Sequence, residues 1–143
     1  MNMLEQLITS FTATAAFAIL FNVPRNTIVQ CGFVGMVGWM LYASSLLIPL
    51  NPILATLIAS FFVTVMSQFF ARLYKTPVIV FSIAGIIPLV PGGLAYDAMK
   101  NVVLNHYDLA VQLAAKAFML SGAIAMGLVF SEVLNQLFRR TKP

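Results

Sequence analysis

Charged side chains are scarce in this sequence. Only 8% of its 143 residues are charged, whereas 61% are hydrophobic, and the mean hydropathy is +0.96. A soluble domain carries about 25% charged and about 45–50% apolar residues. The scarcity of charge therefore excludes a soluble globular protein, a disordered chain and a nucleic-acid-binding module, and it indicates a multi-pass protein of the lipid bilayer.

Cysteine and histidine are almost absent as well. The single cysteine, Cys31, has no second cysteine with which to form an internal disulfide. The single histidine, His106, lies in a polar stretch that predicts a turn. The residues offer no His, Cys and carboxylate cluster for a metal and no nucleophile with a neighbouring base. We therefore expect no metal, no cofactor and no catalytic residue, and we do not expect an enzyme.

The stretches between the few charges predict membrane-spanning helices. The charge-free runs cover residues 6–24, 26–71, 76–96 and 117–131. A span needs about 20 apolar residues, so the second run is long enough for two. Proline and capping signals divide the chain further: Asn51 before Pro52, and Thr76 before Pro77, are each typical of a helix start.

These signals together predict an all-α polytopic membrane bundle in a single integral membrane domain, residues 1–143. Its five hydrophobic helices cover about 3–21, 27–48, 52–73, 77–105 and 109–138, and the fourth is broken at 88–93. The second helix is rich in glycine, which leaves two alternatives open, a full span and a half-inserted segment.

The basic residues predict an orientation in the inner (plasma) membrane. With five crossings, an external N-terminus and a cytoplasmic C-terminus, Arg25, Arg72 and Lys75 fall in cytoplasmic turns, together with Arg139 and its basic neighbours. The turn at residues 49–52 has no charge and falls outside. Every short loop then obeys the tendency of lysine and arginine to stay on the cytoplasmic side.

Two prolines and two glycines interrupt the fourth hydrophobic run. Pro88 and Pro91 each remove a backbone donor, and Gly92 and Gly93 follow directly. Eleven helical residues separate Pro77 from Pro88, about 16 Å, which places the break near the middle of the bilayer. Broken helices at that depth form substrate sites in transporters. We predict that these four residues bind substrate, with a structural kink as the alternative.

Two charged residues extend this candidate site. Asp97 follows one turn after the break, where a charge in the membrane costs about 2.5–3.5 kcal/mol. One hypothesis is that Asp97 faces a central cavity and binds a cation, a substrate ammonium group or a proton. The alternative is that Lys100, three residues on, neutralises it. Lys116 is a further candidate for substrate binding, with snorkelling to the membrane surface as the alternative.

Small residues recur at helical spacing in two of the predicted helices. The second helix carries Gly32, Gly35 and Gly38, and the fifth carries Ala123 and Gly127. Small side chains let membrane helices approach closely. We therefore predict helix packing at these five positions, and a surface for a partner subunit is the functional version of the same prediction.

Three segments resemble the threonine/serine exporter family. They are the helix end Phe21-Asn22-Val23-Pro24, the glycine-rich element that runs to Trp39, and above all Ile87-Pro88-Leu89-Val90-Pro91-Gly92. The resemblance is to the small, C-terminal-type membrane subunit and covers nearly the whole chain. It implies a larger membrane subunit as partner and threonine or serine as substrate, and some two-subunit members are linked to dicarboxylate export.

We therefore expect one subunit of a two-component membrane exporter of small polar carboxylate-bearing solutes, with threonine and serine favoured. A subunit of a dicarboxylate (succinate-like) exporter and a non-transporting membrane assembly or scaffold subunit are the alternatives. The expected partners are the larger subunit, the lipid bilayer and a second copy of the chain. We do not expect the chain to bind nucleic acid.

Overall fold

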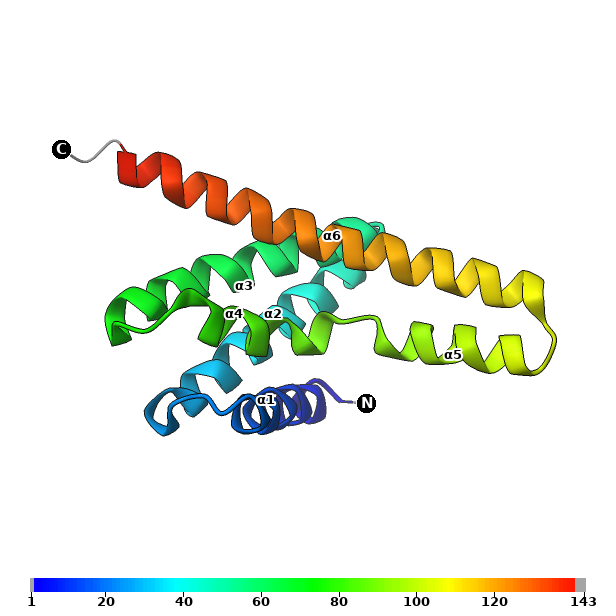
Figure 1. Ribbon diagram of the computed structural model, residues 1–143, viewed down its shortest axis with the longest axis horizontal. Coiled ribbons are helices and arrows are strands. Elements are labelled where there is room, and N and C mark those ends of the chain that lie inside the picture. Colours follow the sequence, from blue (N-terminus) through cyan, green and yellow to red (C-terminus); the bar gives the residue numbers. More distant parts are fainter. Residues whose placement is uncertain (1, 141–143) are drawn as a thin grey trace.

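The computed structural model describes residues 2–140, and no strand occurs among them. Its helices, shown in Figure 1, are α1 (Met3–Leu20), α2 (Ile28–Leu47), α3 (Pro52–Tyr74), α4 (Val78–Ile86), α5 (Gly92–Val103) and α6 (Tyr107–Arg140). Two short 3-10 turns precede α2 and follow α4, namely η1 (Arg25–Thr27) and η2 (Ile87–Leu89). The predicted all-α bundle is confirmed.

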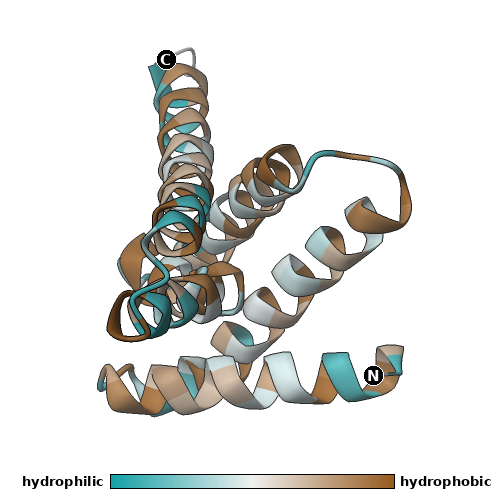
Figure 2. Cartoon of the chain, turned by 90° about the vertical axis from the view of Figure 1, so that its right-hand side faces the viewer, coloured by the Kyte–Doolittle hydropathy of each residue, from teal (hydrophilic) through white to brown (hydrophobic). Residues whose placement is uncertain are grey.

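Four helical segments are long and apolar enough to cross a membrane, and they include the glycine-rich segment Arg25–Leu47. The fifth candidate is the pair formed by Val78–Leu89 and Gly92–Val103, which is bent by 52° at its break. The predicted interruption of the fourth helix is therefore confirmed. Figure 2 shows hydrophobic colour along most of the helices, with hydrophilic residues gathered towards helix ends and turns.

Both helices begin within one residue of their predicted starts, but only one of the two predicted caps is confirmed. Asn51 caps α3, since its Oδ1 accepts a hydrogen bond from the Ile53 N–H at 3.0 Å. Thr76 does not cap α4, which begins at Val78 with Pro77 in the capping position. The reason is that Thr76 belongs to the end of α3: Lys75 adopts a left-handed conformation, and the Thr76 N–H then donates to the Ala71 carbonyl at 3.1 Å.

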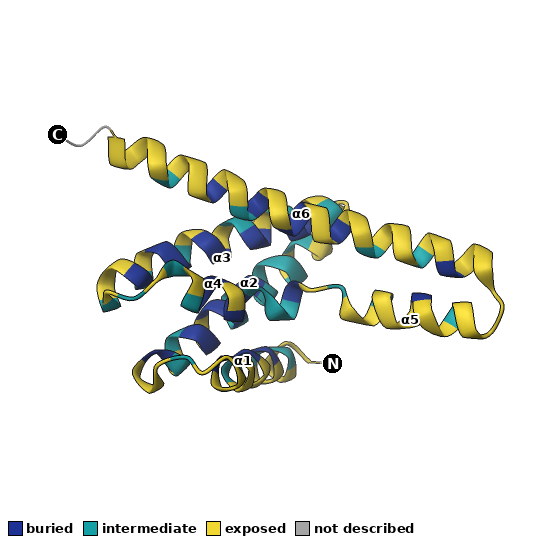
Figure 3. Cartoon of the chain, viewed as in Figure 1, coloured by how far each residue is buried: buried dark blue, intermediate teal, exposed yellow. Residues whose placement is uncertain are grey.

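The core lies where α2, α3 and α4 meet (Figure 3), and apart from Phe81 it consists of small and medium side chains. One cluster, between α1, α2, α3 and α4, contains Ala18, Cys31, Ala71, Phe81 and Ala84. A second, reached by η2 and α6, contains Val34, Ala59, Val63, Leu89 and Ile124. Lipid is as apolar as leucine, so close packing of small residues is what holds such helices together.

Helices α3 and α6 run parallel, and three contacts fix their register. Gly127 lies against Ser60, the Gln68 side-chain amide donates to the Ser131 carbonyl at 3.4 Å, and Arg72 donates to Asn135. Residue numbers rise together on both helices, which places the start of α3 level with about residue 117 of α6. The first part of α6, before residue 117, therefore extends beyond the N-terminal end of α3.

Helix α5 packs mainly on this overhanging part of α6. We call α5 and residues 107–117 of α6 the arm, and in Figure 1 it projects to the right of the other helices. A helix of 34 residues, such as α6, is about 51 Å long, against about 30 Å for the hydrocarbon core. Helix α6 is therefore longer than a single span requires.

Candidate functional site

The break that was predicted to bind substrate lies level with the middle of the bundle. Leu89, at the end of η2, is 7% exposed and packs with Val34 of α2 and with Ala59 and Val63 of α3. Val90 is then extended, and the Gly92 N–H turns back to donate to the Val90 carbonyl at 2.8 Å. The chain thus leaves the core and begins α5 within three residues.

The start of α5 is open. Its capping position is Pro91, and no side chain within the described residues caps the helix. A Cβ atom added at Gly92 or at Gly93 would meet no heavy atom within 4 Å, and neither glycine has a positive φ. In this chain neither packing nor conformation requires glycine at these positions. What the two glycines leave is an uncovered helix N-terminus, which attracts anionic groups.

Asp97 lies one turn further along α5 and is exposed, as is Lys100. The backbone carbonyl of Asp97 accepts a hydrogen bond from the Asn101 side chain at 2.8 Å. Lys116, on α6, is exposed too. Because α5 and α6 form an antiparallel hairpin, Lys116 lies level with about residue 94, near the start of α5.

The candidate substrate-binding residues are therefore gathered from the end of η2 to the arm. Pro88 is half-buried and, with Gln6 and Trp39, borders a shallow cavity of about 220 Å³. The other five (Pro91, Gly92, Gly93, Asp97 and Lys116) lie on or beside the arm. Their role in binding stays a prediction.

The five small residues named from the sequence are buried between helices. Added Cβ atoms at Gly32 and Gly35 would collide with Phe11 and Thr14 of α1, and one at Gly38 would collide with Val63 of α3. On α6, Ala123 is 5% exposed, and Gly127 lies against the backbone of α3. Their part in the stability of the chain stays a prediction.

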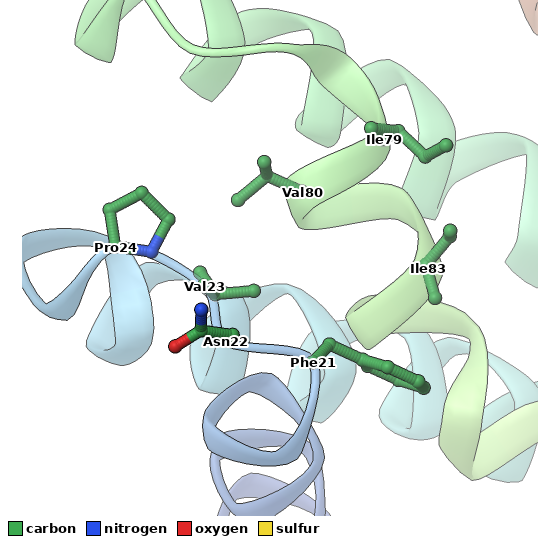
Figure 4. A pocket seen from close by; sticks show the side chains of 7 residues that line it. All are labelled: Phe21, Asn22, Val23, Pro24, Ile79, Val80 and Ile83. Carbon is green, nitrogen blue, oxygen red and sulfur yellow. The ribbon is translucent and has the colours of Figure 1, made fainter.

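Figure 4 shows an apolar pocket at one of the family-like segments. The turn from Phe21 to Pro24 faces Ile79, Val80 and Ile83 of α4 across a cavity of about 320 Å³. Asn22 is the polar residue in its lining and adopts a left-handed conformation with φ of 56°. This turn therefore fits α4 through apolar contacts.

Sequence reasoning missed a polar cluster between α3 and α6. Gln68 is 7% exposed, and its amide donates to the Ser131 carbonyl at 3.4 Å and to Glu132 at 3.3 Å. Arg72, one turn on, donates to Asn135. The signal in the sequence was the spacing of four between Gln68 and Arg72 in an otherwise apolar helix, which puts both on one face.

The chain is similar to one curated protein and to one family of known proteins. An uncharacterized protein of Haemophilus influenzae is 26% identical over 148 residues, an alignment that covers 100% of this chain and 50% of that protein. The chain thus spans half the length of this curated relative, and no solved structure matches it. The sequence model of the family described as threonine/serine exporter, ThrE, matches residues 6–134, so this chain belongs to the threonine/serine exporter family.

Proposed function

We propose that this chain is one subunit of a two-component membrane exporter of small polar carboxylate-bearing solutes, with threonine and serine favoured. The observation that carries the proposal is the open start of α5, with an exposed carboxylate one turn away at Asp97. Membership of the threonine/serine exporter family supports the class, an exporter.

The charges at the start of α5 complement a zwitterion. A helix N-terminus carries about half a positive charge, which attracts a carboxylate. Asp97 lies four residues after Gly93, on the same side of the helix and about 6 Å along its axis. A free amino acid can therefore place its carboxylate at the backbone N–H groups and its ammonium group near Asp97. Lys116 lies at about the same level on α6, and its ammonium group would add a full positive charge for the carboxylate.

A dicarboxylate would meet Asp97 with the wrong charge. Two like charges about 4 Å apart repel by about 4 kcal/mol at an effective dielectric constant near 20. This argument favours threonine and serine over succinate-like solutes as long as Asp97 is ionised. A subunit that only scaffolds a membrane assembly would use the break for packing, yet Gly92 and Gly93 pack against nothing within 4 Å of their Cβ positions.

A second subunit would be needed to enclose the proposed site at the start of α5. Helix α5 packs mainly on α6, and its outer face exposes Tyr96, Met99 and Val103. These three residues, with Lys100 and Leu104, border an open cavity of about 320 Å³. A larger membrane subunit is the occupant that we propose for this face, and the doubled length of the curated relative is consistent with it. A second copy of the chain is the other partner that would cover it.

The proposed setting is the inner (plasma) membrane, with residues 1–143 as one integral membrane domain. Arg72, Lys75 and Arg139 line one cavity at a single end of the bundle, and Figure 1 places the turn before α2 at that end too. Positive charge gathers on the cytoplasmic side of membrane proteins. We propose that this end is cytoplasmic and that the N-terminus and the arm lie outside.

The test is an export assay in cells that lack this gene and its partner and that regain both from a plasmid. We expect Asp97→Asn to lower threonine efflux at least tenfold and to raise dicarboxylate efflux relative to threonine efflux. Asp108→Asn is the matched control, because Asp108 is an exposed aspartate in the first turn of α6.

Normal threonine export by Asp97→Asn would overturn the proposed role of the Asp97 charge. Absence of threonine export with both native subunits present would overturn the proposed substrate.

A further inference from the structure

A polar cavity, which we call the cationic cavity, lies at the opposite end of the bundle from the arm. It has a volume of about 290 Å³ and lies between the ends of α3 and α6 and the start of α4. Three basic side chains line it, Arg72 and Lys75 from α3 and Arg139 from α6. Asn135 and Thr76 complete its polar lining with Gln68. Two helices, α3 and α6, therefore bring three cations to one open cavity.

Hydrogen-bonding groups without partners also border the cavity. The Oγ1 atom of Thr76 is enclosed, and it has no hydrogen-bond partner among residues 2–140. Helix α4 starts beside it, at Val78, without a side-chain cap within the described chain. The first N–H groups of a helix have no partner inside that helix, and they carry the positive end of its dipole. These donors add to the three cations.

The acidic residue closest to this cavity is held by other contacts. The two carboxylate oxygens of Glu132 accept hydrogen bonds from Gln68 and Gln136, both at 3.3 Å. Arg72 is fixed to Asn135, which holds its guanidinium at the cavity wall. Lys75 and Arg139 are exposed side chains that remain able to close on a ligand. The balance of charge in the cavity is therefore positive.

We propose that this cavity is an anion-binding site that accepts a carboxylate or phosphate group. Basic residues at one side of a membrane protein are common, but here they line a cavity that is bordered by an uncapped helix start and by Thr76, whose hydroxyl has no partner among residues 2–140. Its volume is close to the lower limit of small-ligand pockets, about 300 Å³. The anion can come from a soluble carboxylate or phosphate, or from the headgroup of an anionic lipid, since basic pockets between membrane helices bind such headgroups. The proposal holds whether or not the chain exports threonine.

The experiment measures thermal unfolding of the purified chain in a neutral maltoside detergent. Succinate, inorganic phosphate, or mixed micelles with phosphatidylglycerol are added, and sodium chloride keeps the ionic strength constant. Micelles with phosphatidylcholine are the lipid control. A ligand that binds the folded state raises the unfolding temperature, and the dependence on concentration gives its affinity. We expect at least one of the three anions to stabilise the protein.

Variants locate the effect. The double variant Lys75→Gln with Arg139→Gln should weaken anion binding at least tenfold, and Thr76→Val should weaken it severalfold. The control is Arg25→Gln with Lys100→Gln, which removes the same charge elsewhere and should change the affinity less than twofold. Stabilisation by succinate or phosphate indicates a soluble anion, and stabilisation by phosphatidylglycerol alone indicates a lipid headgroup. No response to any anion, or an equal loss in the control, would overturn the site.

Discussion

Replacement of Gly127 by alanine tests whether close approach of α3 and α6 holds the bundle together. A Cβ atom at this position would lie 2.8 Å from the Leu57 carbonyl oxygen and 3.0 Å from the Phe61 nitrogen, with the Ser60 hydroxyl closer still. Ordinary contacts of a Cβ atom begin at 3.4 Å. Two of the three obstacles are backbone atoms, so the helices must move apart by about half an ångström or more, and such overpacking costs about 1–3 kcal/mol.

Gly122, on the same helix, is the matched control. A Cβ atom there would meet no heavy atom within 4 Å. Alanine favours a helix over glycine by about 1 kcal/mol, and Gly122→Ala should therefore be neutral or stabilising. The free energy of unfolding of both variants, measured by circular dichroism during titration with sodium dodecyl sulfate in mixed micelles, should differ by about 1–3 kcal/mol. Equal stability of the two variants would refute the view that this contact holds α6 on α3.

Two further predictions concern the start of α5 and the orientation. Gly92→Ala should leave the stability of the isolated chain within about 0.5 kcal/mol, because its Cβ meets nothing, but should reduce export if a solute or partner approaches this backbone; normal export by this variant would remove the backbone from the proposed site. A reporter that works only in the cytoplasm should be active when fused after Pro143 and silent when inserted at Leu50, and the reverse pattern would invert the proposed topology.

The helices and the break could be predicted because their signals are local. An uncharged run of sufficient length predicts a span whatever surrounds it, and prolines at positions 88 and 91 interrupt a helix by steric clash alone. The cap at Asn51, before Pro52, could be predicted for the same reason. Its capping oxygen accepts a hydrogen bond from the N–H of a residue only two positions away. The same pattern failed at Thr76, because the C-terminal turn of α3 extends to that residue.

The arm and the cationic cavity could not be predicted, because both depend on the register between helices distant in sequence. Nothing in the sequence says that Arg72 meets Asn135, 63 positions away, or that α6 overhangs α3. The bounds of the predicted fifth helix, about 109–138, are close to those of α6, Tyr107–Arg140, but the packing of its first part on α5 was not foreseen.

The two proposed sites lie at opposite ends of α4, one beside its start and the other beyond η2. This placement constrains any path of a solute between them. An anion taken up at the cationic cavity would have to pass along α4 and η2, about 18 Å of helix, to reach the start of α5. The inner side of α4 is closed by Phe81 and Ala84, which are fully buried. Its outer side exposes Ile79 and Ile83, which offer a polar solute no hydrogen bond. For the proposed export, we therefore expect a second subunit to supply polar side chains along α4.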